Sequence, residues 1–265
     1  MSRVLHRSGV VPPMVVGGEG VRLRLADGRE IIDASGGAAV ACLGHGNRRI
    51  AEAIARQAAA VAYAHTGSFI SRPAEELADI ILDGSPGGLT HAYFCSSGSE
   101  GTEAALKIAR QYFVEIGQPE RTRFIARRQG YHGNTLGALG VGGNMMRRAL
   151  YEPLLSDAFS LVSPCFAYRF KRDDESEEQY VDRLIAELDT EFRRLGPETV
   201  IGFVAEPIVG ATTGCVTALL GYFKRVREIC DRYGALLIFD EVMCGMGRTG
   251  TRTPGSRRVR RQMSR

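Results

Sequence analysis

Between residues 91 and 239 the sequence alternates short apolar runs with longer amphipathic segments, and this alternation constrains the fold more than any other feature. The apolar runs predict strands at 91–95, 123–126, 159–162, 200–205 and 235–239. The amphipathic segments predict helices at 100–116, 178–195 and 219–233. Strands that alternate with helices favour a mostly parallel sheet with helices on both faces, so the sequence predicts an α/β fold.

A different pattern precedes this region. Residues 21–25 alternate apolar and charged side chains, Asp27-Gly28 supplies a turn, and residues 30–33 continue, which together predict a β-hairpin. Asn47 and Ser71 can each cap a helix, because apolar residues follow them at helical spacing.

The net charge of +4 resides in the last segment of the chain. Residues 252–265 carry six arginines and no acidic residue. Removing these six from the 34 basic residues leaves 28 against 30 acidic ones, so the predicted fold is not basic. This distribution argues against a nucleic-acid-binding protein.

The six cysteines form no CxxC pair and show no spacing with histidine that is typical of a zinc site. We therefore expect no metal, and reduced, mostly buried thiols of a cytoplasmic protein. No apolar run approaches the ~20 residues of a membrane span, and the short apolar stretch near the N-terminus is broken by Pro12-Pro13. We expect neither a membrane segment nor a signal peptide.

The predicted strand at 91–95 leads into a turn of small residues and then a helix. Backbone amides at a helix start, together with the helix dipole, favour an anion, and Gly98 and Ser99 allow a phosphate to approach the backbone closely. An ordinary helix-capping turn is the alternative interpretation.

A second loop, Gly130-Tyr-His-Gly133, follows the next predicted strand. Tyr131 could stack on a planar cofactor, with His132 beside it. A purely structural loop is the alternative.

Asp240 and Glu241 close an apolar strand. A carboxylate there is costly to bury unless it meets a cation, and a protonated pyridine nitrogen would be such a partner for Asp240. An Asp-Glu pair also ends the metal-binding strand of nucleotide hydrolases. The sequence has no GxxxxGK[ST] loop, which argues against that alternative.

Taken together, four motifs resemble those of class III aminotransferases, which are pyridoxal-phosphate enzymes of fold type I. The motifs are Ser-Gly-Ser-Glu (97–100), Tyr-His-Gly (131–133), Ala-Glu-Pro (205–207) and Phe-Asp-Glu-Val (239–242). Their order and spacing form a specific set, and the resemblance runs from about Gly18 to Thr251.

The resemblance implies roles for two of the loops. Gly98 and Ser99 match the turn that binds the phosphate of pyridoxal 5'-phosphate. Tyr131 matches the aromatic residue that stacks on the pyridine ring, and His132 lies next to it in the motif.

It implies further roles at the other two strand ends. Glu206 matches the active-site glutamate on the O3' side of the cofactor, and Asp240 matches the aspartate that pairs with the pyridinium nitrogen. Val242 matches the residue that packs against the other face of the ring.

The resemblance also implies an organisation. Residues 1–65 would be the hairpin and helix segment of the small domain, 66–251 an incomplete cofactor-binding large domain, and 252–265 an aberrant basic tail. The family implies a homodimer, with an amine or amino acid as amino donor and a 2-oxo acid as acceptor.

The family's Schiff-base lysine is expected ~30 residues after Asp240, beyond the last residue of this chain. The three lysines present, 107, 171 and 224, each have an ordinary solvent-exposed interpretation. We therefore expect a truncated chain that is inactive alone. The alternatives are a non-catalytic fragment, a pseudogene product or a partner subunit, or an aminomutase on the same scaffold. The arginine-rich tail is consistent with a frameshift, which we hold as a hypothesis.

Overall fold

The structure is a computed structural model that describes residues 3–6, 8–85 and 88–251. The chain divides between Leu77 and Ala78 into two compact units. The domain limits expected at residues 65 and 251 stay a prediction. The expected basic tail, 252–265, lies outside the described residues.

The first unit contains a three-stranded antiparallel sheet in the order β1-β2-β3. Its strands are β1 (Val15–Glu19), β2 (Arg22–Leu25) and β3 (Glu30–Ile32). The hairpin predicted around Asp27-Gly28 is confirmed by the pairing of β2 with β3. Strand β1 was not expected, because Gly17-Gly18 interrupts its apolar run and glycine disfavours strands.

Three helices follow, α1 (Gly36–Ala39), α2 (Arg48–Ala60) and α3 (Arg72–Leu82). The predicted cap of α2 is confirmed, since the Asn47 side chain accepts a hydrogen bond from the Ile50 amide at 3.4 Å. Helix α3 begins directly after Ser71, as expected. Neither α2 nor α3 contains a buried residue, and Ile54 and Ile80 are exposed.

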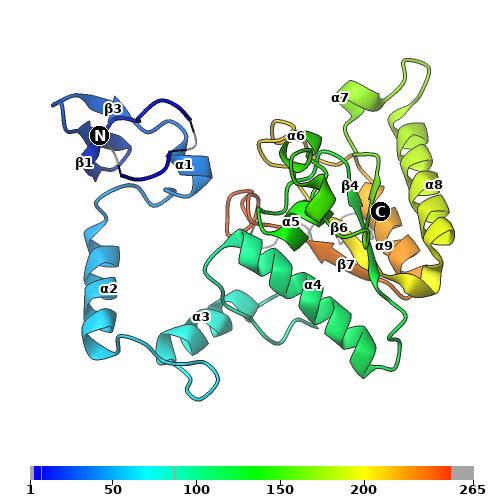
Figure 1. Ribbon diagram of the computed structural model, residues 1–265, viewed down its shortest axis with the longest axis horizontal. Helices are drawn as coiled ribbons and strands as arrows, with labels where there is room; N and C mark the ends of the chain where they lie inside the picture. Colours follow the sequence, from blue (N-terminus) through cyan, green and yellow to red (C-terminus); the bar gives the residue numbers. More distant parts are fainter. Residues whose placement is uncertain (1–2, 7, 86–87, 252–265) are drawn as a thin grey trace. The chain divides into compact units, whose positions relative to one another are not determined.

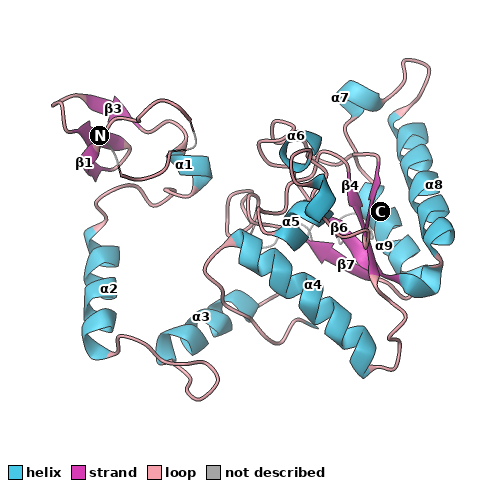
Figure 2. Ribbon diagram, in the orientation of Figure 1, coloured by secondary structure: helices cyan, strands magenta, loops and turns pink. Residues whose placement is uncertain are grey.

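The second unit is built on a four-stranded parallel sheet in the order β5-β4-β6-β7 (Figures 1 and 2). The strands are β4 (Arg123–Arg127), β5 (Phe159–Val162), β6 (Val200–Ala205) and β7 (Leu236–Phe239). All six residues of the central strand β6 are buried, as its continuous apolar run predicts. Four of the five predicted strands are therefore confirmed.

The strand predicted at 91–95 is wrong, because this segment is irregular in the structure. Tyr93 and Phe94 are exposed instead of packing in the sheet. An apolar run becomes a strand only where a neighbour completes its hydrogen bonds. Among the described residues β7 pairs only with β6, and no strand reaches residues 91–95.

Helices cover both faces of this sheet (Figure 1). One core forms between the sheet and helices α8 (Glu177–Leu195) and α9 (Tyr222–Arg232). The other forms against α4 (Gly98–Glu115) and α5 (Leu136–Val141). The predicted α/β architecture is thus confirmed. The short remaining elements are α6 (Met145–Arg148), η2 (Glu152–Leu154), α7 (Ala167–Phe170) and η3 (Pro197–Thr199).

Helix α8 shows how the sequence builds one of these layers. The Ser176 and Gln179 side chains form a capping box at its start, and Gly196, at φ +85°, follows its end. Its buried side chains recur every three or four positions: Tyr180, Val181, Leu184, Ile185, Leu188 and Phe192. Burying one such side chain contributes about 1.5–3 kcal/mol, so this face alone fixes the helix on the sheet.

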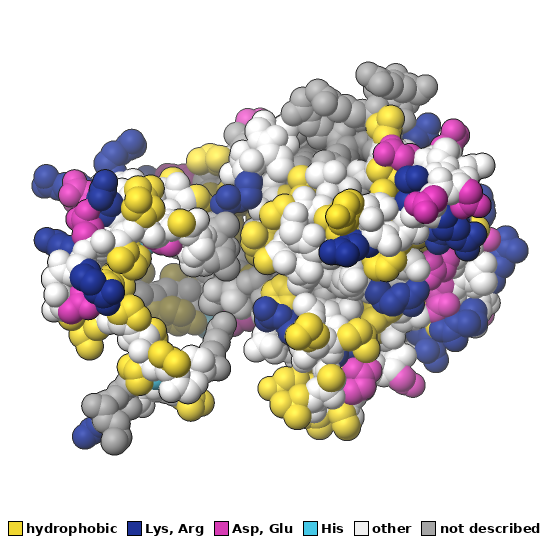
Figure 3. All heavy atoms as spheres, turned by 90° about the horizontal axis from the view of Figure 1, so that it is seen from above, with side chains coloured by type: hydrophobic (Ala, Val, Ile, Leu, Met, Phe, Trp, Pro, Cys, Tyr) yellow, Lys and Arg dark blue, Asp and Glu magenta, His cyan; other side chains and the backbone are white. Residues whose placement is uncertain are grey.

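The outer surfaces of α8 and α9 carry charges of both signs. Arg225 pairs with Asp182, and Arg232 with Asp189, between the two helices. Figure 3 shows this mixture of basic and acidic side chains at the side of the unit where α8 lies. Exposed pairs of this kind add little to stability. No helix among the described residues is long and apolar enough to cross a bilayer.

Candidate functional site

The first turn of α4 lies at one edge of the candidate site. The Ser97 hydroxyl accepts a hydrogen bond from the Glu100 amide at 3.2 Å, and the Glu100 carboxylate accepts one from the Ser96 amide at 2.7 Å. These two hydrogen bonds cap the 18-residue helix α4, whose first two residues are Gly98 and Ser99. First-turn amides have no partner within a helix, so this end is suited to an anion.

Gly98 lies against Val242, another of the predicted site residues. A β-carbon on Gly98 would lie 3.1 Å from Cγ2 of Val242. The Val242 side chain therefore already lies against the glycine, and it is otherwise 71% exposed. Because a β-carbon at position 98 would press on the Val242 side chain, this contact favours glycine there.

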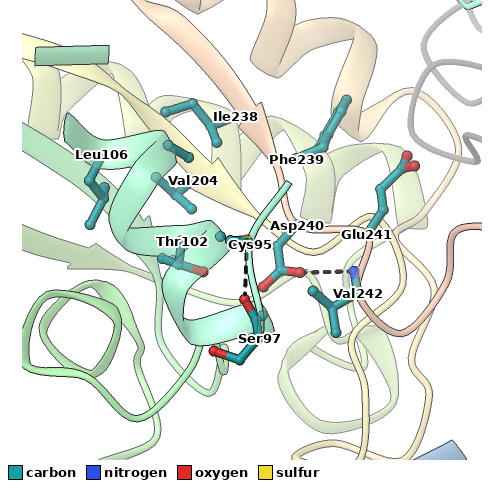
Figure 4. Close-up of a pocket in the computed structure, with 13 residues that line it drawn as sticks. Cys95, Ser97, Thr102, Leu106, Val204, Ile238, Phe239, Asp240, Glu241 and Val242 are labelled. Atoms are coloured by element: carbon teal, nitrogen blue, oxygen red, sulfur yellow. Dashed lines mark hydrogen bonds between the residues drawn. The ribbon is translucent and has the colours of Figure 1, made fainter. Parts of the chain in front are cut away.

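A cavity of about 260 Å³ lies beside this contact (Figure 4). Three of the predicted site residues, Gly98, Asp240 and Val242, line it. Apolar residues of α4, β6 and β7 form much of the rest: Ala105, Leu106, Val204, Ile238 and Phe239. In Figure 4 the Asp240 carboxylate lies near Val242, whereas the Glu241 side chain extends away from it.

The carboxylate of Asp240 is held in a fixed direction. Its Oδ2 lies 2.8 Å from Nδ1 of His132, and its Oδ1 accepts a hydrogen bond from the Val242 amide at 3.0 Å. The backbone amide of Asp240 donates to the carbonyl of Ala205 at 3.0 Å, which extends the pairing of β7 with β6. The His132 ring is buried, and the Thr102 hydroxyl of α4 donates to the His132 carbonyl at 2.7 Å.

Glu206 is the second buried carboxylate of the site. Its Oε1 accepts from the Tyr131 amide and its Oε2 from the Gly210 amide, both at 2.9 Å. Burial raises the pKa of Glu206, although these two amides and nearby His132 act in the opposite direction. Glu206 thus ties the Tyr-His-Gly loop to the segment that follows β6.

Tyr131 and Ser99 already have partners in the structure. The Arg147 guanidinium lies 4.7 Å from the centre of the Tyr131 ring, and the Ser99 hydroxyl accepts from the Asn134 amide at 2.9 Å. Gly133, at φ +136°, makes the latter contact possible, because a β-carbon there would lie 2.7 Å from the Ser99 hydroxyl. One face of the Tyr131 ring therefore contacts a cation.

The structure gathers the predicted residues into two linked groups. Gly98, Asp240 and Val242 line the cavity. His132 does not line it but contacts the Asp240 carboxylate. The other three, Ser99, Tyr131 and Glu206, do not line this cavity, and the loop around Tyr131 connects them to it. Across the described part of the chain, no group of three or more His, Cys, Asp and Glu side chains could hold a metal ion.

Our interpretation of the sequence missed three supporting residues, Thr102, Gly210 and Arg127. Thr102 follows Ser99 by one helical turn, so helical spacing could have placed it beside the loop. Gly210 follows Glu206 by four positions in a turn-rich segment. Arg127 ends an otherwise buried strand, where a charged side chain signals a specific partner.

Comparison with known proteins identifies relatives along nearly the whole chain. The family model described as class-III aminotransferase matches residues 5–252. An uncharacterized aminotransferase of Schizosaccharomyces pombe is 51% identical over 91% of this chain and 52% of its own length. A hypotaurine/taurine–pyruvate aminotransferase of Paracoccus denitrificans is 37% identical over 91% of this chain and 51% of its own length.

Solved structures of omega transaminases are also similar to this chain. An omega transaminase from Pseudomonas jessenii in complex with PMP superposes with a TM-score of 0.88 at 33% identity. It matches over 93% of this chain and 54% of its own. A thermostable (S)-enantioselective omega-transaminase from Thermomicrobium roseum gives 0.86 at 37% identity, over 94% and 54%. The chain thus spans about half the length of the relatives it matches.

Proposed function

Because this chain belongs to the class-III aminotransferase family, we propose that it forms the cofactor-binding part of a pyridoxal-phosphate-dependent aminotransferase. The observation that carries the proposal is the contact of Asp240 with the buried ring of His132 beside the cavity. A carboxylate that is oriented in this way, yet lies at a cavity, is suited to a cationic ring nitrogen.

The residues present fit such a cofactor at both of its ends. Gly98 and the capped start of α4 would hold the phosphate, since first-turn amides and the helix dipole favour an anion. Asp240 would hold a proton at the pyridine nitrogen. When bound, pyridoxal phosphate supplies the electron sink that lets an amino group be exchanged for a carbonyl.

Three further residues would position the ring. Val242, which lies against Gly98, would contact one face of the ring, and Tyr131 the other. Glu206 would act on the O3' side, where its carboxylate is fixed by the Tyr131 and Gly210 amides. These side chains would bind and orient the cofactor without forming a covalent bond to it.

We further propose that this chain alone does not complete amino transfer. None of its three lysines lines the cavity beside Asp240. Lys107 is exposed on α4, Lys171 donates to the carbonyls of Arg172 and Glu175, and Lys224 lies on α9. Covalent attachment and proton transfer in this reaction class need an amine at the cofactor.

The proposed substrates are an amine or amino acid as donor and a 2-oxo acid as acceptor. The name of the relative that uses hypotaurine or taurine with pyruvate supports this pairing of chemical classes. A homodimer and a cytoplasmic location complete the proposal. All six cysteines are free thiols, which agrees with a reducing compartment.

The test is an absorbance spectrum of the purified chain with pyridoxal phosphate, followed by borohydride and gel filtration. We expect the cofactor to co-elute before reduction and no covalent label afterwards. The Asp240→Asn variant should lose the cofactor, while Asp173→Asn, a change at an exposed loop carboxylate, should retain it. A covalent label would contradict the proposed inactivity, and equal binding by both variants would contradict the site.

A further inference from the structure

Arg127, the last residue of β4, is a buried cation, with only 3% of its surface exposed. Its guanidinium carbon lies 5.5 Å from the centre of the Phe223 ring and 5.9 Å from that of Tyr222. Its Nη2 donates a hydrogen bond to the backbone carbonyl of Glu206. Among the described residues no carboxylate forms an ion pair with it.

Such a group costs more free energy to bury than an apolar side chain of similar size would. Two ring faces and one carbonyl compensate for part of this cost. The nearby Tyr222 hydroxyl stays neutral, because burial raises its pKa. A hydrophobic residue at this position could not replace the hydrogen bond that Arg127 donates to the Glu206 carbonyl.

The position of that bond links Arg127 to the site. Strand β4 pairs directly with β6, and Glu206 is the first residue after β6. The backbone carbonyl of Arg127 also accepts from the Gly130 amide at 3.2 Å, at the start of the Tyr131 loop. Arg127 thus contacts both segments that the Glu206 carboxylate joins, the one at Tyr131 and the one at Gly210.

We propose that Arg127 is a positioning residue for Glu206. By fixing the Glu206 backbone, its guanidinium places the carboxylate where it accepts the Tyr131 and Gly210 amides together. The loop that carries Tyr131 and His132 is thereby held at the site. The use of this positioning in catalysis rests on the proposed function, whereas the contact itself does not.

The experiment is amide hydrogen exchange by NMR on the full chain without cofactor. It compares the wild-type chain with Arg127→Met, Arg127→Lys and Arg123→Met. The last is a matched control, since Arg123 begins the same strand and, within the described part of the chain, its side chain bonds only to the Asp157 carbonyl, at 3.5 Å.

In Arg127→Met we expect the Tyr131 and Gly210 amides to exchange roughly tenfold faster or more, as local opening becomes easier. In the same variant the amides of α8 should keep their wild-type exchange rates. In Arg123→Met the Tyr131 and Gly210 amides should also exchange at wild-type rates. Lysine lacks the planar fork of arginine, so Arg127→Lys should give an intermediate increase at the same two amides. Unchanged rates at both amides, or an equal increase throughout the sheet, would overturn the proposal.

If Arg127→Met does not fold, the exchange rates of Arg127→Lys decide. Wild-type rates at the Tyr131 and Gly210 amides of that variant, or its failure to fold, overturn the proposal.

Cofactor affinity is the second readout. Arg127→Met should bind pyridoxal phosphate about tenfold more weakly than Arg123→Met, with partial recovery in Arg127→Lys, because one lost positioning hydrogen bond has about that effect. If the wild-type chain binds no cofactor, the proposed function fails, and the exchange rates still test Arg127.

Discussion

The Nδ1 atom of His132 lies 2.8 Å from the Oδ2 atom of Asp240, although the two residues are 108 positions apart. His132 belongs to the loop after β4 and Asp240 follows β7, with β6 between these strands in the sheet. The parallel order brings the carboxyl ends of all three strands to one edge, where ligands of such sheets bind. Together with the hydrogen bond from the Val242 amide to Oδ1, this contact fixes the direction of the Asp240 carboxylate.

Removing the imidazole should therefore weaken cofactor binding. In His132→Ala the Asp240 carboxylate loses one partner, and we expect roughly tenfold lower affinity for pyridoxal phosphate, the effect of one hydrogen bond of this kind. His132→Asn, which keeps a donor, should recover part of the loss. Fluorescence titration measures both, with His91→Ala, a change at an exposed histidine, as control. Equal affinities in His132→Ala and His91→Ala would contradict this role.

The contact of Gly98 with Val242 gives a double-mutant test. Gly98→Ala places a methyl group 3.1 Å from Cγ2 of Val242, and overpacking of this kind costs about 1–3 kcal/mol. Val242→Ala removes the obstructing methyl groups. Denaturant unfolding should show that Gly98→Ala is destabilised, and that Gly98→Ala/Val242→Ala is closer to Val242→Ala alone. Strictly additive effects would mean that the two residues do not touch.

The sequence predicted the elements that carry their own local signals, such as a helix cap, and the elements that are buried on all sides. Strand β6 reads as one apolar run because both of its faces are covered, and α8 shows its cap and buried face directly. Residues 91–95 have the composition of a strand but no pairing partner among the described residues. Strand formation depends on such a neighbour, which composition does not encode.

The site shows the same division. The strand-end positions of Asp240 and Glu206 follow from the order of strands and helices, so both could be predicted. The partners of these carboxylates could not. His132 reaches Asp240, and Gly210 reaches Glu206, through loop conformations that no periodicity describes. Tertiary geometry decides these contacts.

Glu206 makes stability depend on pH in a definite direction. Because burial raises its pKa above 4.5, the folded state binds the proton more tightly than the unfolded chain does. The folding free energy should therefore become less favourable as the pH rises from 4.5 through the raised pKa. Denaturant unfolding at a series of pH values should show this slope reduced in Glu206→Gln. A slope that is unchanged or larger in the variant would disprove the assignment.

The cysteines should differ in their reactivity. Burial raises the pKa of Cys244 to about 11, whereas Cys95 is exposed and lines the cavity. Only the thiolate reacts with iodoacetamide, so at pH 8 Cys244 should be alkylated more slowly than an ordinary exposed thiol by on the order of 100-fold. Peptide mass spectrometry after timed labelling measures both sites. Similar rates at Cys95 and Cys244 would show that the segment after Asp240 does not pack as described.

The central claim is that Asp240 faces the ring nitrogen of a bound pyridoxal phosphate. The most direct measurement is the ¹⁵N chemical shift of ring-labelled cofactor bound to the full chain and to Asp240→Asn. We predict a protonated nitrogen in the wild-type complex, and, in any complex that the variant forms, an unprotonated one, because asparagine offers no negative charge to hold the proton. The same protonation state in both complexes, or no bound cofactor in the wild-type chain, would contradict the account.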